Sequence, residues 1–519
     1  MDYKHRVYYQ LLNYAFLDSN GSGMGDFKGI ATKLPYLKEL GVGGIWLSPV
    51  HKSMSYHSYD VLDYCSQKDD YIVDGYTLDH LIADAKKYDI AIMLDMVFNH
   101  TGLEHSWFKG AVAYALGLTK DATYKDFYVF KDKPPKVDNG WYEYKKAGKS
   151  IWYYASFSPT MPDLNFSTTF DYDNDPVFNA ILDVLKYWVD KGVYAFRLDA
   201  IRHFYEIRHK VEDVSSNQKL LQALSKKIKE YNQDVFLLGE AFIENKRLSN
   251  FAIGIDSVVN FPVAGKLRDM CKDGFDIIKY ACDIQLACKK HDKAFTLTNI
   301  ISSHDEGTGR FTTSVSSKIN DMYIAAILNI MLPGIPLIYY GDEVGVLAKK
   351  EYVSKRYKVS YKDSINRTPM PWTKNIIPAN YILDTVRDKN DKPIISKCET
   401  IGTVYNKTIE DILKDNSSLY YYYKALIDIR NKHFDLFYKG NIYSYDTTFN
   451  KSKVLYYDIE YCGDILGVII NTSTKPKVFD IEKPFEVLHT LSKNGDSASI
   501  SNSRISMPPI SVSIIKYMA

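Results

Sequence analysis

Eight short apolar runs, separated by segments with helical character, constrain the fold of this chain most strongly. They lie at residues 7–16, 43–50, 90–100, 194–200, 235–242, 257–262, 294–306 and 335–343. Short buried strands that alternate with helices are typical of parallel β/α units. Eight such units predict an α/β fold of the (β/α)8 TIM-barrel type, in which functional groups gather where the strands end.

The chain is longer than a barrel requires. It has 519 residues, whereas a TIM barrel typically needs about 250. Residues 101–165, after the third run, are rich in Tyr, Trp, Lys, Gly and Pro with little helical periodicity, which indicates an inserted subdomain. After a helical segment at 418–432, short alternating runs such as 453–461 and 510–517 predict a C-terminal antiparallel β-sandwich. We therefore predict barrel segments at 1–100 and 166–437, the insertion at 101–165 and the sandwich at 438–519.

Charge and composition favour a neutral partner. The formal net charge is only +2, from 65 basic and 63 acidic residues, so there is no excess field to attract a nucleic acid or an anionic membrane. Aromatic residues make up 14%, with 43 Tyr, and such rings with polar tips suit a sugar. We expect a neutral carbohydrate substrate and no nucleic-acid partner. The oligomeric state stays open.

Neither the start of the chain nor its cysteines indicate a membrane or metal class. The N-terminus lacks an apolar signal region, and no run reaches the roughly 20 apolar residues of a membrane span. We expect no membrane span and a cytoplasmic protein, or a secreted one whose export signal was removed. The six cysteines form no C-x-x-C pair and no His cluster at zinc spacing. We predict mostly free, buried thiols and no organic cofactor.

Two strand ends supply carboxyl groups in contrasting surroundings. In the fourth run, Arg197 and Asp199 share one side of an alternating strand, so the guanidinium should keep the carboxylate charged. Glu240 ends an apolar stretch, where desolvation should raise its pKa and leave it protonated. One ionised and one protonated carboxyl group is the division of labour that retaining glycoside cleavage requires.

Further polar side chains follow two other runs. The seventh run ends in His304 and Asp305, and the third carries Asp95, Asn99 and His100. A single acidic residue at a strand end is more often a helix cap or an ion-pair partner than a catalyst. Several acids and two histidines at four strand ends of one barrel favour a site for sugar hydroxyls.

These segments resemble the signature regions of a known family. DMVFNH (95–100), FRLDA (196–200), GEAF (239–242) and SHD (303–305) are similar to the four conserved regions of the α-amylase family, glycoside hydrolase family 13. The similarity extends to GVGGIWLSP (41–49), YHSYDVLDY (56–64), MPDLN (161–165), GIPLIYYGDE (334–343) and RTPMPW (367–372). It covers the barrel and the insertion and, more weakly, the C-terminal part.

The resemblance implies a catalytic role for three carboxyl groups. Asp199 would attack the anomeric carbon to form a covalent β-glucosyl intermediate, and Glu240 would act as acid and then base. Asp305 would hold hydroxyls of the sugar at the transition state. His100 and His304 would assist Asp305, and Arg197 would orient the nucleophile.

The resemblance also implies substrate contacts on both sides of the reacting sugar. Tyr59 would stack beneath the ring, although for this residue alone a core position is nearly as plausible, and Asp60 and Arg367 would close the non-reducing side. Arg202 and His203 resemble the Lys-His pair that amylases use for the leaving group; the alternative is a structural role at a helix start.

Three features of the motifs bear on linkage preference. MPDLN resembles the group intermediate between oligo-1,6-glucosidases and neopullulanases, which contains α-amylases and maltooligosaccharide enzymes. Ala200 follows the nucleophile at a place where relatives that prefer α-1,6 bonds usually carry Val. Together with the Arg202-His203 pair, these features favour α-1,4 cleavage of starch or maltooligosaccharides.

The loop at 18–26 resembles a calcium loop of related glucosidases. Its oxygen ligands recur at alternate positions, and glycines permit the sharp turn. Ser22 replaces the middle acidic ligand, which should weaken binding, and the alternative is a metal-free loop held by its own hydrogen bonds. The candidate ligands of a structural Ca²⁺ are Asp18, Asn20, Ser22, Met24 and Asp26.

Two departures and three alternatives qualify this prediction. Ser303 and Ser58 stand where the family usually has Asn and Gly, although neither replaces a carboxyl group. The chain could instead be an oligo-1,6-glucosidase or α-glucosidase. It could also be a transferase or trehalose-forming isomerase, because a sugar hydroxyl can intercept the same intermediate. A non-catalytic binding protein is the third alternative, but such a protein would be expected to lack one of the three acids.

Overall fold

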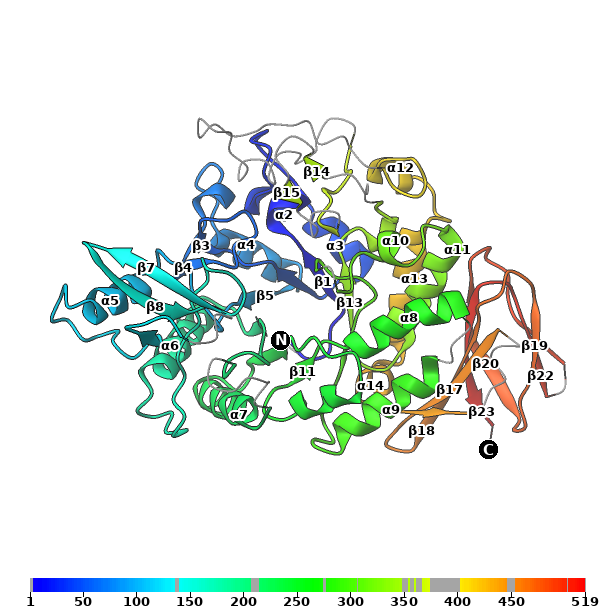
Figure 1. The fold of residues 1–519 in the computed structure, drawn as a ribbon. Helices are drawn as coiled ribbons and strands as arrows, with labels where there is room; N and C mark the ends of the chain where they lie inside the picture. The colour runs from blue at the N-terminus through cyan, green and yellow to red at the C-terminus, as the bar shows by residue number, and fades with distance from the viewer. Residues whose placement is uncertain are drawn as a thin grey trace.

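A computed structural model describes most of the chain and places the barrel between the insertion and the C-terminal sheets (Figure 1). The described residues are 3–135, 140–206, 214–273, 277–305, 307–347, 353–354, 359–360, 366–373, 402–445, 453–501 and 503–518.

Eight parallel strands form the barrel, each within one of the eight predicted runs. They pair in the order β11-β10-β9-β5-β2-β1-β13-β12, and a parallel bridge from Val259 to Thr298 joins the two outer strands. The predicted α/β barrel is therefore confirmed. The strands are β1 (Tyr8–Leu11), β2 (Gly44–Leu47), β5 (Ala91–Met96), β9 (Ala195–Leu198), β10 (Phe236–Gly239), β11 (Ser257–Val258), β12 (Thr298–Asn299) and β13 (Ile335–Tyr339).

Helices surround the barrel (Figure 1). The longer ones are α4 (Leu78–Lys87), α6 (Pro176–Asp190), α7 (Val214–Tyr231), α8 (Phe261–Asp273), α9 (Ile277–Lys289), α11 (Ile319–Met331) and α13 (Leu419–Lys432). Shorter segments are α1 (Asn13–Phe16), α2 (Phe27–Thr32), α3 (Leu34–Leu40), α10 (Phe311–Ser314), α12 (Ile409–Ile412), α14 (Phe434–Lys439), η1 (Asp69–Tyr71), η2 (Lys246–Phe251) and η3 (Asp342–Val344).

Helix α6 shows how the sequence sets such an element. Asp175 precedes it and accepts hydrogen bonds from the backbone N–H groups of Val177 and Phe178. Pro176 occupies the first turn, where its missing N–H is no loss. Apolar residues at helical spacing, including Phe178 and Trp188, are buried against the strands.

Alternate strand residues fill the barrel interior. Side chains that point inward form one buried cluster, separate from the larger cluster between strands and helices. The interior cluster includes Tyr8, Trp46, Met93, Ala195, Phe236, Leu238, Val259, Ile300 and Leu337. The barrel is therefore a packed core, and only its end layer is polar.

The insertion has a small sheet and one helix. Strands β6 (Phe130–Lys131), β7 (Trp141–Lys146) and β8 (Lys149–Tyr154) form an antiparallel sheet in the order β6-β8-β7. Helix α5 (Ser106–Ala115) packs beneath it through Phe108, whose ring contacts Tyr144 and Tyr153. The expectation of little helical periodicity missed this ten-residue helix. Its buried residues, Phe108, Ala111 and Val112, cover barely more than one turn.

The remaining strands are antiparallel. A hairpin of β3 (His51–Ser53) and β4 (Val61–Gln67) follows β2, and β14 (Val353–Ser354) pairs with β15 (Val359–Ser360). The C-terminal sheets have the orders β16-β17-β18-β23-β20 and β19-β22-β21. Their strands are β16 (Asn441–Ser444), β17 (Val454–Tyr461), β18 (Asp464–Asn471), β19 (Lys477–Asp480), β20 (Phe485–Ser492), β21 (Ser499–Ser501), β22 (Arg504–Met507) and β23 (Ser511–Tyr517). Domain boundaries at residues 100, 165 and 437 remain our proposal.

The described cysteines depart in part from prediction. Cys65, Cys282, Cys288 and Cys462 are free, but Cys65 and Cys462 are exposed, so the expectation of buried thiols was wrong for these two. Cys398 and the side chain of Cys271 lie outside what the structure describes.

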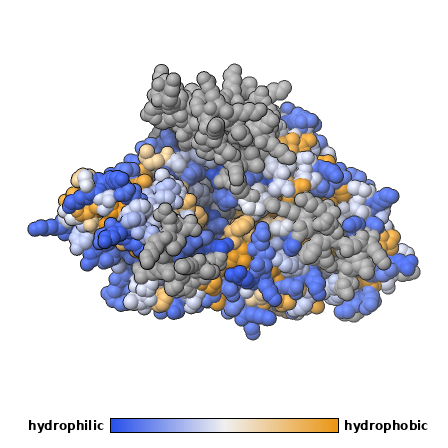
Figure 2. Space-filling view, viewed as in Figure 1, coloured by the Kyte–Doolittle hydropathy of each residue, from blue (hydrophilic) through white to orange (hydrophobic). Residues whose placement is uncertain are grey.

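Among the helices described, none combines the length and apolar character that crossing a bilayer requires. On the coloured part of the face in Figure 2, hydrophobic residues are interspersed among hydrophilic ones.

Candidate active site

Arg197 lies at the centre of a buried group of carboxyl groups at the ends of β5, β9 and β10. Its Nη1 lies 2.7 Å from Oδ1 of Asp95 and 2.5 Å from Oδ1 of Asp199, and its Nη2 lies 3.6 Å from Oε2 of Glu240. The guanidinium is 1% exposed and rests on the Trp46 ring, 5.0 Å from its centroid. The period of two therefore places Arg197 and Asp199 together, and a permanent positive charge balances the acids.

Glu240 sits in surroundings that differ from those of Asp199. Burial raises the pKa of Glu240, and the neighbouring Asp199 adds to this, while Arg197 opposes it. The carboxyl Oε2 accepts a hydrogen bond of 2.9 Å from the backbone N–H of Ala200. One carboxyl group paired closely with a guanidinium and a second one biased towards protonation can supply a nucleophile and a proton donor.

A chain of hydrogen bonds links Asp95 through Tyr59 and His304 to Gln10 of β1. The Gln10 amide donates to Nδ1 of His304 over 2.8 Å, so the neutral imidazole carries its hydrogen on Nε2, 2.8 Å from the Tyr59 hydroxyl. Tyr59 in turn donates to Oδ2 of Asp95 over 3.2 Å. Burial lowers the pKa of His304 to about 4, which agrees with a neutral ring. The Tyr59 ring, only partly buried, is thereby held parallel to His304.

Asp305 stands at the rim beside two basic groups. Its Oδ1 lies 3.4 Å from Nη2 of Arg367, and its Oδ2 lies 3.4 Å from Nε2 of His304. Burial alone would raise the pKa of Asp305, but the neighbouring His304 and the guanidinium groups of Arg367 and Arg197 outweigh it and lower that pKa. The side chain is 45% exposed, so an ionised carboxylate is available to hydroxyl donors.

Arg197, Glu240, His304 and Asp305 line one small cavity at this end of the barrel, together with Trp46 and other side chains. The structure thus brings four of the predicted residues together around one space.

Asp60 shapes the loop that carries Tyr59. Its carboxylate accepts hydrogen bonds from the backbone N–H groups of Met54 and Ser55. Arg367 instead donates to the carbonyl of His304 and to the Tyr56 hydroxyl, besides contacting Asp305. Ser58 in the same loop has φ of 63°, a left-handed conformation that favours the glycine usual in the family.

The second side of the site combines two histidines and an aromatic ring. Phe157, from the insertion, is 51% exposed and lies between His100 and His203, with centroid distances of 5.4 and 5.0 Å. Nδ1 of His203 is hydrogen-bonded to Glu206, and the Arg202 guanidinium donates to the carbonyl of Phe242. His100 and His203, predicted on separate motifs, therefore flank one exposed ring.

Four neighbours of the site were not predicted as site residues: Gln10, Trp46, Phe157 and Glu206. Gln10 and Trp46 belong to strand runs in which alternation alone marks them as inward-facing. Phe157 and Glu206 carry no pattern that distinguishes them; the position of Phe157 depends on how the insertion folds over the barrel, and that of Glu206 on the turns after β9.

The loop at 18–26 is held by its own hydrogen bonds. Asp18 accepts from the backbone N–H groups of Asn20, Gly21, Ser22 and Gly23. Asp26 accepts from Ser19 and caps α2 through Gly29. The Asn20 side chain accepts from the Ser22 N–H, and the Ser22 hydroxyl donates to the Met24 carbonyl.

The donor set of this loop fits a cation only if it rearranges. Its oxygen atoms are those that Ca²⁺ prefers, but in this conformation its carboxylates face N–H groups rather than one shared point. No cluster of three acidic, His or Cys groups that could hold a metal occurs within the described residues. Calcium at this loop remains a proposal.

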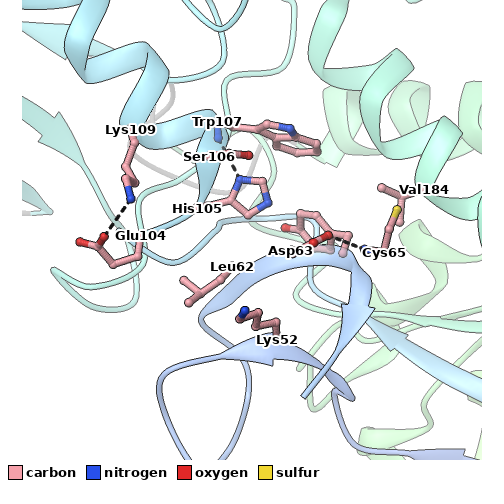
Figure 3. Close-up of a pocket in the computed structure, with 11 residues that line it drawn as sticks. Lys52, Leu62, Asp63, Cys65, Glu104, His105, Ser106, Trp107, Lys109 and Val184 are labelled. Carbon is pink, nitrogen blue, oxygen red and sulfur yellow. Dashed lines mark hydrogen bonds and ion pairs between the residues drawn. The ribbon is translucent and has the colours of Figure 1, made fainter. Parts of the chain in front are cut away.

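A larger cavity of about 690 Å³ lies outside this site, between the β3–β4 hairpin and the start of α5 (Figure 3). Its lining includes Asp63, Cys65, His105 and Trp107, and none of the predicted site residues. Tyr64, also in its lining, donates its hydroxyl to the carbonyl of His100.

Comparison with known families gives one match. The family model described as "Alpha amylase, catalytic domain" matches residues 10–440. This range begins in β1 and ends just before β16, so it includes the barrel and the insertion.

Curated proteins and solved structures give concordant similarities. Alpha-amylase 3 of Dictyoglomus thermophilum is 32% identical over 438 residues, which cover 83% of this chain and 78% of that protein. Oligo-1,6-glucosidase of Bacillus cereus is 27% identical over 526 residues, which cover 87% and 90%. The structure of Eubacterium rectale Amy13B aligns with a TM-score of 0.80 and 25% identity, covering 100% of this chain and 96% of that one.

Proposed function

This chain belongs to the α-amylase family of glycoside hydrolases, and on that premise we propose that it hydrolyses α-1,4 bonds of maltooligosaccharides or starch with retention of configuration. Asp199 is the proposed nucleophile, Glu240 the acid and base, and Asp305 the acid that binds hydroxyls of the reacting sugar.

The contact of Arg197 with both Asp199 and Glu240 carries this proposal. The guanidinium lies against Asp199 at 2.5 Å but 3.6 Å from Glu240, so it stabilises the charged form of Asp199 more strongly. Burial meanwhile favours the protonated form of Glu240. In a retaining mechanism Asp199 attacks the anomeric carbon while Glu240 transfers its proton to the leaving oxygen. Glu240 then takes a proton from the water that releases the sugar.

The neighbouring groups support the remaining roles. An ionised Asp305 offers acceptor oxygens to vicinal hydroxyls, and Arg367 fixes this carboxylate. Tyr59, held at its hydroxyl by His304 and Asp95, presents its ring to the sugar. Phe157, 51% exposed between His100 and His203, offers a ring on which a leaving sugar can rest. Asp60 acts by shaping the Tyr59 loop.

Preference for the α-1,4 linkage rests on the residue after the nucleophile. Ala200 has a small side chain beside the bond to be cleaved, and its backbone N–H contacts Glu240. Arg202 and His203 lie two and three residues after Ala200, and the contact of His203 with the exposed Phe157 ring supports a role for this pair at the leaving-group side. The relative named oligo-1,6-glucosidase makes α-1,6 cleavage the alternative to be tested.

The decisive experiment is a product time course on maltoheptaose beside isomaltotriose, each at low and high concentration, with products resolved by anomer. We expect α-configured maltooligosaccharides from maltoheptaose and little turnover of isomaltotriose. Release of glucose mainly from isomaltotriose would show instead an oligo-1,6-glucosidase. Products longer than the substrate at high concentration would identify transfer to sugar hydroxyls. The Asp199→Asn variant is the control for contaminating activity.

A further inference from the structure

One face of the sheet in the insertion carries aromatic side chains that are half-buried. Along β8, Ile151 and Tyr153 are buried, whereas Trp152 and Tyr154 are only half-buried, as the period of two in a strand requires. The register places Trp141 of β7 directly opposite Tyr154. Trp141, Trp152 and Tyr154 therefore lie on the face that points away from α5, which we call the aromatic face.

Polar side chains accompany the three rings. Tyr154 and Trp141 contact each other edge to face, with centroids 5.5 Å apart. Nζ of Lys131 lies 4.0 Å from the centroid of Trp141, and Lys131 pairs with Trp152 in the register. Glu143 lies opposite Trp152 on the other side and forms an ion pair with Lys145. Flat rings bordered by side chains that can donate and accept hydrogen bonds suit a ligand with many hydroxyl groups.

The aromatic face begins beside the proposed leaving-group side of the site. The backbone carbonyl of Tyr154 accepts a hydrogen bond of 3.1 Å from Asp163, which itself pairs as a bridge with His100. The pKa of Tyr154 is raised to about 12, by burial first and then by the charges of Glu206 and Asp163. Glu206 is the partner of His203. Through Asp163 and Glu206, the aromatic face therefore adjoins the segments that carry His100 and His203, the two neighbours of Phe157.

We propose that the aromatic face binds an α-glucan chain that extends from the leaving-group side of the active site, with Trp141 and Trp152 as stacking platforms. The proposal rests on the proposed function, since it names where the longer part of the same substrate would lie. A nucleic acid would require several basic groups that contact phosphates, whereas the Lys131, Glu143 and Lys145 set carries a net charge of only +1 and Lys145 is paired with Glu143.

The test combines binding and kinetics in a Trp141→Ala/Trp152→Ala double variant of the full chain. Binding to glycogen is measured by affinity electrophoresis in a Glu240→Gln background, so that the polymer is not degraded. In the active background, kcat/KM on amylose is divided by kcat/KM on maltotriose. Tyr114→Ala is the matched control, because Tyr114 is an exposed aromatic residue of α5, beneath the opposite face of the sheet. Trp141→Phe/Trp152→Phe tests rescue by a ring.

We expect the double Ala variant to bind glycogen about tenfold more weakly and to lower the amylose-to-maltotriose ratio by about five- to tenfold, as for loss of an aromatic contact. The Trp141→Phe/Trp152→Phe variant should recover most of the glycogen affinity and most of the amylose-to-maltotriose ratio. Tyr114→Ala should change neither quantity. The proposal would be overturned if the double Ala substitution changed neither the binding to glycogen nor the ratio of kcat/KM on amylose to kcat/KM on maltotriose.

The two proposals can fail separately. If the wild type cleaves maltotriose and amylose but the double variant behaves identically, the aromatic face is wrong and the proposed function stands. If the Glu240→Gln protein binds glycogen through the two Trp residues while the wild type cleaves no α-1,4 bond, the aromatic face is supported and the proposed function falls. If barley β-glucan retarded the Glu240→Gln protein in affinity electrophoresis as strongly as glycogen does, this result would also count against an α-glucan site.

Discussion

The backbone N–H of Ala200 donates a 2.9 Å hydrogen bond to Oε2 of Glu240. Ala200 directly follows Asp199 and has φ of 50°, in the left-handed region. One turn of backbone therefore positions both carboxyl groups, because the turn after β9 that carries Asp199 also directs the Ala200 N–H towards Glu240. Strained backbone of this kind persists where the surroundings determine it, and it is concentrated at functional sites.

The first prediction concerns this backbone conformation. Ala200→Val should lower the thermal midpoint and reduce activity on maltoheptaose, because a β-branched residue in the left-handed region costs about 1–3 kcal/mol. Ala200→Gly should retain the midpoint within a few degrees, since glycine adopts this φ without strain. Differential scanning calorimetry and initial rates measure both. A Val variant as stable as the wild type would show that the residue is not constrained.

The second prediction concerns the proposed nucleophile. Asp199→Asn should lower kcat on maltoheptaose by about 10³-fold or more, because the amide cannot form the covalent intermediate. Folding should persist, since Arg197 keeps its 2.7 Å contact with Asp95. Circular dichroism and product assays check the two parts. Full hydrolysis by this variant would exclude Asp199 as the nucleophile.

The third prediction separates the acid role of Glu240 from its base role. Glu240→Gln should abolish turnover of unactivated maltooligosaccharides, yet still release fluoride from α-maltosyl fluoride, whose leaving group needs no proton. Burial raises the pKa of Glu240, so wild-type activity should fall as pH rises through that pKa and the acid loses its proton. The fluoride-release rate of the variant should lack this alkaline limb. Normal turnover of maltoheptaose by the variant would reject the assignment.

The fourth prediction concerns Asp342, a buried acid at the start of η3. Burial raises its pKa to about 7, so the folded protein retains a proton that the unfolded chain releases above its ordinary pKa of about 4. Stability should therefore fall as pH rises from about 4 to about 7, by about 1.4 kcal/mol for each unit of pKa difference as an upper bound.

Asp342→Asn cannot ionise, and its thermal midpoint should thus rise relative to the wild type between pH 4 and pH 8. Asp74→Asn, which alters an exposed acid paired with Lys28, is the control and should show no such trend. Parallel pH dependence of the wild type and Asp342→Asn would contradict the raised pKa.

The fifth prediction concerns the loop at 18–26. We expect Ca²⁺ to raise the thermal midpoint and a chelator to reverse the rise, because a ligand that binds the folded state alone stabilises it. Asp18→Asn should abolish this response and also lower the midpoint without calcium, since Asp18 accepts four loop N–H groups. A wild-type midpoint that does not respond to Ca²⁺ would leave the loop as a metal-free element.

How far the sequence could predict the structure differs between the strands and the loops. The barrel strands were predictable because each is a short apolar run, and alternation placed Arg197 and Asp199 on one side. The runs overestimated β11 and β12, which have only two residues each, since apolar character continues beyond the ladder. Contacts of Phe157 and Gln10 arise from segments far apart in the chain, and no local pattern specifies them. The exposure of Cys65 likewise depends on the hairpin in which it lies.

Closure of the barrel between β11 and β12 rests on a short seam. Besides the bridge from Val259 to Thr298, the Asn260 N–H donates to the Thr298 carbonyl over 2.8 Å. This seam lies between the strand end that carries Glu240 and the one that carries Asp305. The spacing of these two acids is therefore the dimension of the site that backbone pairing restrains least. Amide hydrogens at the seam should exchange with solvent sooner than those of β5 and β9. A sugar that binds both Glu240 and Asp305 would hold β11 and β12 together and slow the exchange of these amide hydrogens. Bound substrate would thus make this part of the barrel more rigid.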